Sequence, residues 1–375
     1  MPDSDEFYMR RALQLAWQGL GLTSPNPIVG AVVVAGDRIV GEGFHVYSTR
    51  KHAETWALEH AGAAARGSVL YVTLEPCSHH GRTPPCTDQV IQTGVSRVII
   101  ATGDPNPQMD GTGFQRLCSA GIELTVGVCE SEARRQNEAY RKFILTRQPF
   151  VILKTAMTLD GKIAEANGAS QWISCERSRQ KVQELRFSSD AVLTGMGTIS
   201  ADDPLLTDRT QKPRNRSLLR VVLDTGLRLP KTSKLVQSRK EGEILVFCSE
   251  GQDPQRKRIL NEAGVEIVPV ALRDGKIPLD AVLAELGRRD IVQLLVEAGS
   301  EINFEAIRSA SVDKLLCFVA PKILGGNTPK PVFGGDGFTL LHNAAHLRFS
   351  STEMIGDDLL IEAYVSNLEG SNHSA

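Results

Sequence analysis

The chain has 375 residues, of which 41% are hydrophobic and 23% are charged, proportions typical of a globular protein with two or three domains. Its net charge is −2, and the halves agree: residues 1–148 hold 14 Lys/Arg against 15 Asp/Glu, and the remainder holds 28 against 29. Neither half therefore has the positive excess of a nucleic-acid-binding domain. The acidic N-terminus lacks an apolar leader and no apolar run approaches the ~20 residues that span a bilayer, so we expect a cytoplasmic protein without membrane contact.

The first half of the chain alternates helical and strand patterns. Apolar residues recur at helical spacing from Tyr8 to Trp17, and Gly36-Asp37 is a hairpin signal between two apolar runs. The patterns predict helices over 8–17, 52–65, 88–92 and 113–119, and strands over 28–35, 38–43, 69–74, 97–101 and 123–128. These elements complete a three-layer α/β unit, which we expect to occupy residues 1–146.

A second α/β series begins after Pro149. Apolar, β-rich runs predict strands over 150–155, 190–195, 218–224, 243–249, 265–270 and 291–297, with helices over 178–188, 254–263 and 279–287. We expect a second domain over residues 149–366, with a surface loop at 207–217 and a disordered tail at 367–375.

Seven cysteines form an odd, scattered set, which argues against a disulfide framework. Only Cys77 and Cys86 have polar, motif-like surroundings, and they follow the triplet His52-Ala-Glu54. One imidazole and two thiolates suit a catalytic zinc site, which keeps its fourth position open. Nucleobase deaminases carry H-x-E followed by P-C-x-x-C, but here eight residues separate the cysteines. Loop closure depends weakly on length, so the longer gap is compatible with a site in which Glu54 shuttles protons.

A structural zinc site is the alternative interpretation of these residues. His79 or His80 would then be the fourth ligand, and Glu54 would lie on a solvated helix face. A structural site has no use for the upstream H-x-E pair, which favours the catalytic interpretation.

The first half resembles the deaminase half of the bifunctional riboflavin biosynthesis proteins. The residues that carry the resemblance are Ser24-Pro-Asn26-Pro-Ile-Val-Gly-Ala, His52-Ala-Glu54, the segment from Glu75-Pro-Cys77 to Pro-Pro-Cys86, and Asp104-Pro-Asn-Pro-Gln. The wide cysteine spacing is that family's own variant, so the resemblance implies a substrate other than a nucleic-acid base, with Asn26 in the substrate site. The chain departs from the family at residues 47–51, where family members usually have Ala-Gly before the zinc histidine.

Two glycine patterns in the second half leave alternatives open. Gly195-x-Gly197 follows a strand but lacks the third glycine of a dinucleotide fingerprint, so a plain tight turn explains it at least as well. The strand over 291–297, followed by small residues and a helix start, forms either an anion site or an ordinary βα loop.

The second half resembles the reductase half of the same family, through Lys154-Thr-Ala-Met-Thr-Leu-Asp-Gly, Ser170-Gln-Trp172 and the run from Gly195 to Thr207. The resemblance implies a fold similar to dihydrofolate reductase and the cofactor NADPH. It places cofactor contacts at Ala156, Trp172, Thr198, Asp202, Thr225, Gly299, Ser300, Glu301, Ile302, Asn303, Phe304 and Glu305. It places substrate contacts at Ser170, Arg186, Leu206, Arg209 and Glu297. Lys154, which opens the loop after a strand, would orient the ribose or the carboxamide. Guanidinium groups suit a sugar phosphate, although each arginine alone resembles an ordinary surface charge, and Lys154 an exposed strand-end lysine.

The resemblance thus predicts zinc-dependent deamination of a pyrimidine ribose phosphate followed by NADPH-dependent reduction of its ribosyl group, in an α/β protein of two domains, one cytidine-deaminase-like and one dihydrofolate-reductase-like. We also expect a homo-oligomer. Two rival hypotheses are a nucleic-acid deaminase with a binding module, which the near-neutral halves disfavour, and a structural zinc protein without catalysis.

Overall fold

The computed structural model describes residues 4–79, 84–109, 111–165 and 172–366. The chain forms two compact units. The first comprises residues 1–147 together with the short segment 213–216, and the second comprises 148–212 and 217–375. Asn215 belongs to the first unit because its backbone N–H and side-chain amide donate to the carbonyls of Gly21 and Ser24.

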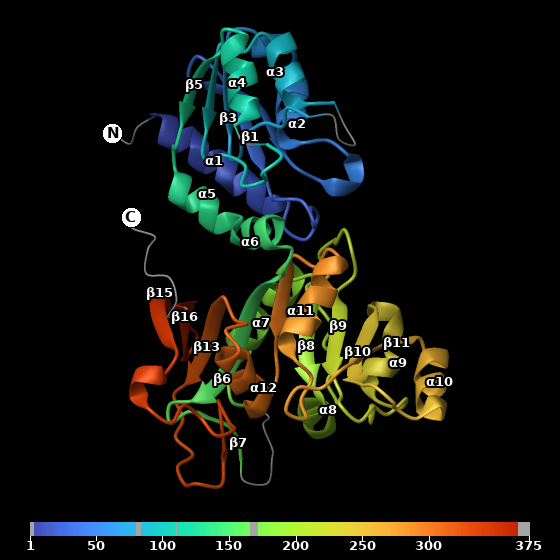
Figure 1. The fold of residues 1–375 in the computed structure, drawn as a ribbon. Helices are drawn as coiled ribbons and strands as arrows, with labels where there is room; N and C mark the ends of the chain where they lie inside the picture. The colour runs from blue at the N-terminus through green and yellow to red at the C-terminus, as the bar shows by residue number, and fades with distance from the viewer. Residues whose placement is uncertain (1–3, 80–83, 110, 166–171, 367–375) are drawn as a thin grey trace. The chain divides into compact units, whose positions relative to one another are not determined.

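The first unit is built on a five-stranded sheet with the order β2-β1-β3-β4-β5 (Figure 1). Its strands are β1 (Gly30–Ala35), β2 (Arg38–Phe44), β3 (Val69–Val72), β4 (Arg97–Ile100) and β5 (Glu123–Val126), and β1 pairs antiparallel with β2 and β3 while β3, β4 and β5 are parallel. Its helices are α1 (Ser4–Gln18), α2 (Ala53–Ala61), α3 (Cys86–Thr93), α4 (Thr112–Ser119), α5 (Glu130–Gln136) and α6 (Glu138–Thr146), with 3₁₀ turns η1 (Tyr47–Thr49) and η2 (Gly62–Ala65).

The alternation of side chains along β1 creates the three layers. Ala31 and Val33 pack into the core shared with α2, whereas Val32 and Val34 pack into the core shared with α1. Gly41 on β2 allows α2 to lie close to the sheet, because a Cβ atom there would be 2.0 Å from the carbonyl oxygen of Ala57. The sheet therefore carries α2 and its preceding histidine on one face.

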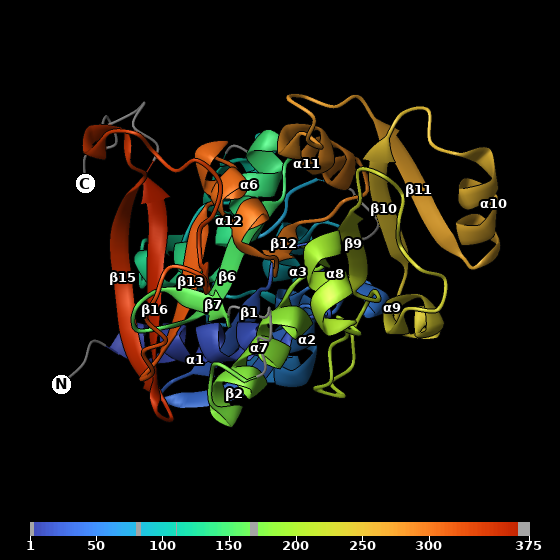
Figure 2. The same ribbon diagram turned by 90° about the horizontal axis from the view of Figure 1, so that it is seen from below.

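The second unit contains a nine-stranded sheet with the order β11-β10-β9-β8-β12-β6-β13-β16-β15 (Figure 2). Its strands are β6 (Phe150–Thr158), β8 (Ala191–Gly195), β9 (Leu219–Leu223), β10 (Ile244–Ser249), β11 (Val265–Val270), β12 (Gln293–Val296), β13 (Lys314–Ala320), β15 (His346–Ile355) and β16 (Asp358–Ser366), and a small second sheet pairs β7 (Lys162–Ala164) with β14 (Lys330–Pro331). The helices are α7 (Glu176–Ser188), α8 (Met196–Asp202), α9 (Lys234–Gln237), α10 (Pro254–Glu262), α11 (Leu279–Arg288) and α12 (Ser300–Arg308), with 3₁₀ turns η3 (Arg239–Glu241) and η4 (Leu341–Asn343).

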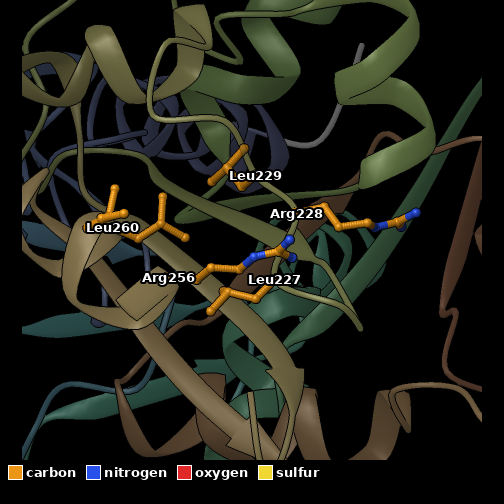
Figure 3. Close-up of a pocket in the computed structure, with 6 residues that line it drawn as sticks. Leu227, Arg228, Leu229, Arg256 and Leu260 are labelled. Carbon is orange, nitrogen blue, oxygen red and sulfur yellow. The ribbon is translucent and has the colours of Figure 1, made fainter. Parts of the chain in front are cut away.

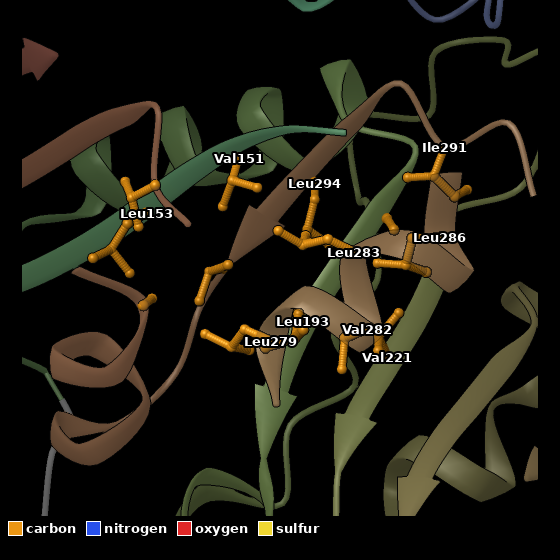
Figure 4. Close-up of a cluster of buried hydrophobic side chains, with 14 of the residues drawn as sticks. Val151, Leu153, Leu193, Val221, Leu279, Val282, Leu283, Leu286, Ile291 and Leu294 are labelled. Carbon is orange, nitrogen blue, oxygen red and sulfur yellow. The ribbon is translucent and has the colours of Figure 1, made fainter. Parts of the chain in front are cut away.

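Two apolar cores cover the two faces of this sheet. In one core, Leu279, Val282 and Leu286 of α11 pack on Val221 and Leu294 of the strands (Figure 4). The other core joins α8, α9 and α10 to the opposite side of β8, β9 and β10. Strands from β11 to β13 are parallel, and only the β13–β16 and β16–β15 pairs are antiparallel. The predicted class of two α/β domains is confirmed.

The sequence patterns missed several elements. They gave no strand for β13, β15 or β16 and no helix for α5, α6 or α8. Strand β15 lies at the sheet edge and is mostly exposed, so it lacks an alternating apolar pattern. The predicted helix over 52–65 ends as an α-helix at Ala61 and continues as η2. Within the described ranges, the helices are all too short or too polar to traverse a bilayer.

Candidate active sites

The three predicted zinc ligands converge in the first unit. His52 directly precedes α2, Cys77 follows β3, and Cys86 begins α3. Their ligand atoms all lie within 4.8 Å of one another, with His52 Nδ1 3.1 Å from Cys86 Sγ and 3.5 Å from Cys77 Sγ. Among the residues that the structure describes, this is the one group of at least three His, Cys, Asp or Glu side chains suited to a metal. One imidazole and two thiols at this spacing fit zinc.

The pKa values of His52, Cys77 and Cys86 are shifted by the contacts of these side chains with one another. Hydrogen bonds with Cys86 and with His52 together lower the pKa of Cys77 to about 4. The pKa of His52 is raised to about 8, chiefly by its hydrogen bond to Cys77. The pKa of the Cys86 thiol is raised because it donates to Cys77 and because it is buried. Zinc binding would replace the protons on His52 and Cys86.

Glu54 points into the same cluster. It lies in the first turn of α2 and is 4% exposed. Burial raises the pKa of its carboxyl group, and a hydrogen bond with the Cys86 thiol partly offsets that effect. Glu54 is not among the three clustered ligands.

His45 links the predicted substrate residue Asn26 to the zinc histidine. Its Nδ1 lies 3.0 Å from the Lys51 carbonyl oxygen, and its Nε2 lies 3.1 Å from Asn26 Nδ2. The ring packs edge-on against His52, with centroids 5.1 Å apart. Burial lowers the pKa of His45 to about 4, so the ring is neutral: Nδ1–H donates to Lys51 and Nε2 accepts from Asn26. The amide orientation of Asn26 is thereby fixed.

The segment that departs from the family pattern has a defined conformation. Residues 47–49 form η1, Arg50 is left-handed with φ 57°, and Lys51 pairs with Glu59 on α2 through a 2.7 Å contact. The Lys51 carbonyl is directed at His45. This segment therefore contacts the histidine that packs against His52.

A buried carboxylate ties the loop after β4 to the cysteine segment. Glu75 is 4% exposed and accepts from the backbone N–H groups of Gly113 at 2.9 Å and Asp104 at 3.3 Å. Asp104 in turn accepts from Tyr140 at 3.2 Å. His79 contacts the sulfur of Met109 and is not part of the metal cluster, and His80 lies outside the described residues.

The predicted cofactor residues of the second unit gather at the carboxyl ends of adjacent parallel strands. Ala156 lies near the end of β6, Thr198 follows β8, Thr225 follows β9 and Gly299 follows β12. The order β9-β8-β12-β6 makes these strands neighbours. A Cβ atom at Gly299 would lie 3.9 Å from Thr198 Oγ1, so the two loops meet. Ligands of open α/β sheets bind at this edge.

The structure explains the Gly195-x-Gly197 pattern through packing. A Cβ atom at Gly195 would lie 2.3 Å from Cδ1 of Ile302, whereas one at Gly197 would meet nothing within 4 Å. Because Gly195 has no side chain, α12 can approach the end of β8, and Ile302 of α12 makes the contact.

Other predicted cofactor residues have protein partners. Ser300 donates to the Pro331 carbonyl, Asn303 donates to the Val332 carbonyl at 3.0 Å, and Phe304 packs on Phe338. Glu305 pairs with Arg308 and Lys276, and Glu301 is exposed. Trp172 is 63% exposed beneath the Arg179 guanidinium, Asp202 ends α8, and Ser170 lies outside the described residues.

Three predicted substrate residues form one buried ion cluster. Arg186 donates to the two carboxylate oxygens of Glu297 at 2.6 and 3.1 Å, and Lys154 Nζ lies 3.4 Å from Glu297 Oε2. Burial alone would raise the pKa of Glu297, but Arg186 and Lys154 outweigh it and hold that pKa at about 2. Glu297 is therefore ionised, and Arg186 is engaged in orienting it.

The other two predicted substrate residues lie in the loop after α8. Leu206 is buried, and Arg209 is exposed with its backbone N–H donating to Gln183 at 3.2 Å. An exposed guanidinium at this position is accessible to a phosphate group.

A pocket of about 280 Å³ follows Thr225, between the loop after β9 and α10 (Figure 3). Its lining comprises Leu227, Arg228, Leu229, Arg256, Ile259 and Leu260. Sequence reasoning did not identify this pocket, because its two walls are almost 30 residues apart and neither has a recognisable motif.

Comparisons with known proteins assign both halves. A profile for the cytidine and deoxycytidylate deaminase zinc-binding region matches residues 2–102, and one for the RibD C-terminal domain matches residues 149–361. The chain is 41% identical to the riboflavin biosynthesis protein RibD of Actinobacillus pleuropneumoniae, over 97% of this chain and 96% of that protein. Two solved structures are similar to this chain: form 1 of Acinetobacter baumannii RibD (TM-score 0.86, 35% identity) and a deaminase/reductase from Thermotoga maritima (TM-score 0.85, 38% identity). Each match covers 97% of this chain and 99% of the solved chain. The chain belongs to the RibD family of riboflavin biosynthesis proteins, which are zinc-dependent deaminases and NADPH-dependent reductases in one polypeptide.

Proposed function

We propose that the first unit hydrolyses the 2-amino group of 2,5-diamino-6-(5-phosphoribosylamino)pyrimidin-4-one. The convergence of His52, Cys77 and Cys86 with the buried Glu54 carries this proposal. Zinc held by these three ligands would lower the pKa of a water molecule. Glu54 takes a proton as water adds to C2 and returns a proton to the departing nitrogen, so that the C–N bond breaks and ammonia leaves.

Asn26 and His45 orient the pyrimidine in this proposal. Because the Asn26 amide nitrogen is held by His45, its oxygen faces the ligand and accepts from an N–H group of the aminopyrimidine. A carbonyl oxygen at the same place would meet an acceptor instead of a donor. The pair therefore favours an amino substrate.

We propose that the second unit reduces the ribosyl group of the deaminated product to give 5-amino-6-(5-phosphoribitylamino)uracil. NADPH would supply a hydride to the ribose C1, and the ring oxygen would gain a proton as the ring opens. Ala156, Thr198, Thr225 and the start of α12 surround the cofactor end of the sheet. Glu297 and Lys154 contact the ribose, Arg186 holds Glu297 in place, and Arg209 binds the phosphate.

The pocket after Thr225 would distinguish NADPH from NADH. Arg256 brings a guanidinium group to a wall that is largely aliphatic (Figure 3), a combination that suits the adenine ring with its 2′-phosphate. Arg256 is steadied by a 3.4 Å hydrogen bond to the Gly226 carbonyl.

We further propose a cytoplasmic homo-oligomer. All seven cysteines are unpaired, as in reducing compartments, and the edge strand β15 exposes Phe349 and Met354. Light scattering of the purified protein would test the oligomeric state.

Incubation of the purified protein with the diaminopyrimidine phosphate tests both activities. Without NADPH we expect ammonia and the ribosylamino-uracil, and with NADPH the ribitylamino-uracil. Bound zinc without ammonia release would support a structural zinc protein instead.

A further inference from the structure

Leu206 has an unusual backbone for a large apolar residue. Its φ is 54°, in the left-handed region that favours glycine, and its side chain is 3% exposed in the core beneath β8 and β9. Residues held in this conformation cluster at functional sites, where surrounding contacts enforce it. The neighbouring carbonyl groups, of Leu205 and Thr207, show which contacts do so here.

On one side, Arg220 holds the Leu205 carbonyl. This β9 residue has no exposed surface, and its Nη1 donates to the oxygens of Leu205 at 3.3 Å, Leu235 at 3.2 Å and Ser238 Oγ at 2.7 Å. Its Nη2 donates to the carbonyls of Ser238 and Gly242. One guanidinium therefore ties the loop to the segment from α9 to Gly242.

On the other side, Arg186 holds the Thr207 carbonyl. Its Nη1 donates to that oxygen at 3.1 Å, while its Nε and Nη2 bind Glu297. The same side chain thus connects the position of Glu297 to the position of the loop.

The chemistry of Arg220 argues against simple space filling. Burial lowers the pKa of its guanidinium, and these five hydrogen bonds all end on neutral oxygens. A buried cation that gains no carboxylate hydrogen bond is costly, and an apolar side chain would fill a core more cheaply. What arginine adds is a planar fork that fixes several carbonyls at once.

We propose that Arg186 and Arg220 form a two-sided carbonyl clamp that keeps Leu206 left-handed and so places Arg209 for the phosphate of the reductase substrate. Arg220 is a positioning residue in this arrangement and does not touch the substrate. The proposal rests on the proposed reductase activity of the second unit.

Arg220→Lys is the central test. A single ammonium group keeps the charge but cannot reach both Leu205 and Gly242. We expect the KM for the ribosylamino-uracil phosphate to rise roughly 5- to 20-fold, as for a lost positioning contact, while kcat and the Kd of NADPH stay within about twofold. In the Leu206→Gly background the effect of Arg220→Lys should shrink at least about threefold, because glycine adopts positive φ without a clamp.

A readout independent of activity is the rate of trypsin cleavage after Arg209, which should increase in Arg220→Lys. Val265→Ala, a change in the same apolar core, controls for general destabilisation and should leave both KM and this cleavage near wild type. If Arg220→Lys does not fold, Ser238→Ala, which removes one anchor of Arg220, should shift both readouts in the same direction by less.

The clamp would be refuted by a folded Arg220→Lys enzyme with unchanged KM and cleavage, by an equal effect in both Leu206 backgrounds, or by parallel losses of kcat and NADPH affinity. A wild-type enzyme without reductase activity would instead refute the proposed function. In that case cleavage after Arg209 still decides the clamp, since Arg220→Lys must exceed the Val265→Ala control.

Discussion

Glu54→Gln should separate the two activities. The substitution keeps the shape of the side chain and removes its ability to exchange protons. Glu54 lies beside the ligand cluster without belonging to it, so zinc should remain bound at about one ion per chain. The second unit has its own cores, so reduction of substrate supplied already deaminated should proceed at the wild-type rate.

The burial of Glu54 sets the expected magnitude. A positioned acid or base contributes roughly 10²–10⁴-fold to a rate. Glu54 is only 4% exposed, so bulk water is poorly placed to substitute for it. We therefore expect deamination to fall by the upper part of that range, roughly 10³–10⁴-fold, which corresponds to about 4–5.5 kcal/mol of transition-state stabilisation.

The assay measures zinc content, ammonia release and NADPH oxidation on each variant. Glu59→Gln is a matched control, because Glu59 lies on the same helix but forms an exposed pair with Lys51 that is worth at most about 1 kcal/mol. That variant should deaminate at nearly the wild-type rate. Full deamination by Glu54→Gln, or joint loss of both activities in a folded protein, would refute Glu54 as the proton shuttle of a separate site.

Four further predictions address the other groups. Cys86→Ser should lose zinc and destabilise the first unit, since metal binding is coupled to folding; retention of zinc by elemental analysis would contradict this. Arg209→Ala should raise the reductase KM by roughly 10-fold or more at constant NADPH affinity, the cost of a charge-assisted hydrogen bond; an unchanged KM would remove the phosphate assignment. Arg186→Ala should raise KM and also lower the melting temperature, because Glu297 would stay buried with one cation partner fewer; a thermal scan matching wild type would count against that ion pair. Arg256→Ala should weaken binding of NADPH, and of 2′,5′-ADP, without weakening binding of NADH, as measured by calorimetry; equal losses for both cofactors would place the 2′-phosphate elsewhere.

The pH dependence of stability tests the buried ion cluster. Glu297 takes up its proton near its ordinary pKa of 4.5 when unfolded but only at about 2 when folded, so between these values the unfolded chain binds more protons. The free energy of unfolding should therefore fall as pH drops from about 5 towards 2, by a total on the order of 3 kcal/mol. Glu297→Gln should lack this component in urea unfolding at pH 5.5 and 3.5. The same slope in variant and wild type would contradict the depressed pKa.

The zinc site could be predicted because each of its residues can be recognised from its near neighbours in the sequence. His52 and Glu54 are two residues apart, Cys77 lies in the loop after β3, and Cys86 begins α3. His45 could not be recognised in this way. His45 directly follows β2. Its role depends on the Lys51 carbonyl on one side of the ring and on Asn26 on the other. No spacing pattern in the sequence encodes this geometry.

In the reductase half, the secondary-structure elements were easier to predict than the contacts of the charged residues. Strands β6, β8, β9, β10, β11 and β12 and helices α7, α10 and α11 were predicted from their apolar patterns, but the contacts of the charged residues were not. Arg186 was expected to contact the substrate phosphate, because the second half of the chain resembles the reductase half of the family. In the folded unit α7 brings it against Glu297, 111 residues later, and against the Thr207 carbonyl. A contact of that sequence separation is determined by helix packing on the sheet, which residue type alone does not specify.

Two glycines have roles that sequence motifs could not predict, because those roles depend on packing. Gly195-x-Gly197 suggested either a cofactor loop or a tight turn, and the structure gives Gly195 a third explanation, since Ile302 of α12 occupies the space of its missing side chain. Gly113 is similar: a Cβ atom there would lie 2.3 Å from the Pro76 carbonyl and 2.9 Å from Glu75 Oε1. In both cases the glycine brings a helix start close to a site segment, to Gly299 in one unit and to Cys77 in the other. The function of these glycines is therefore expressed through the loops they allow to meet, and substitution by alanine should displace those loops before it affects any direct ligand contact.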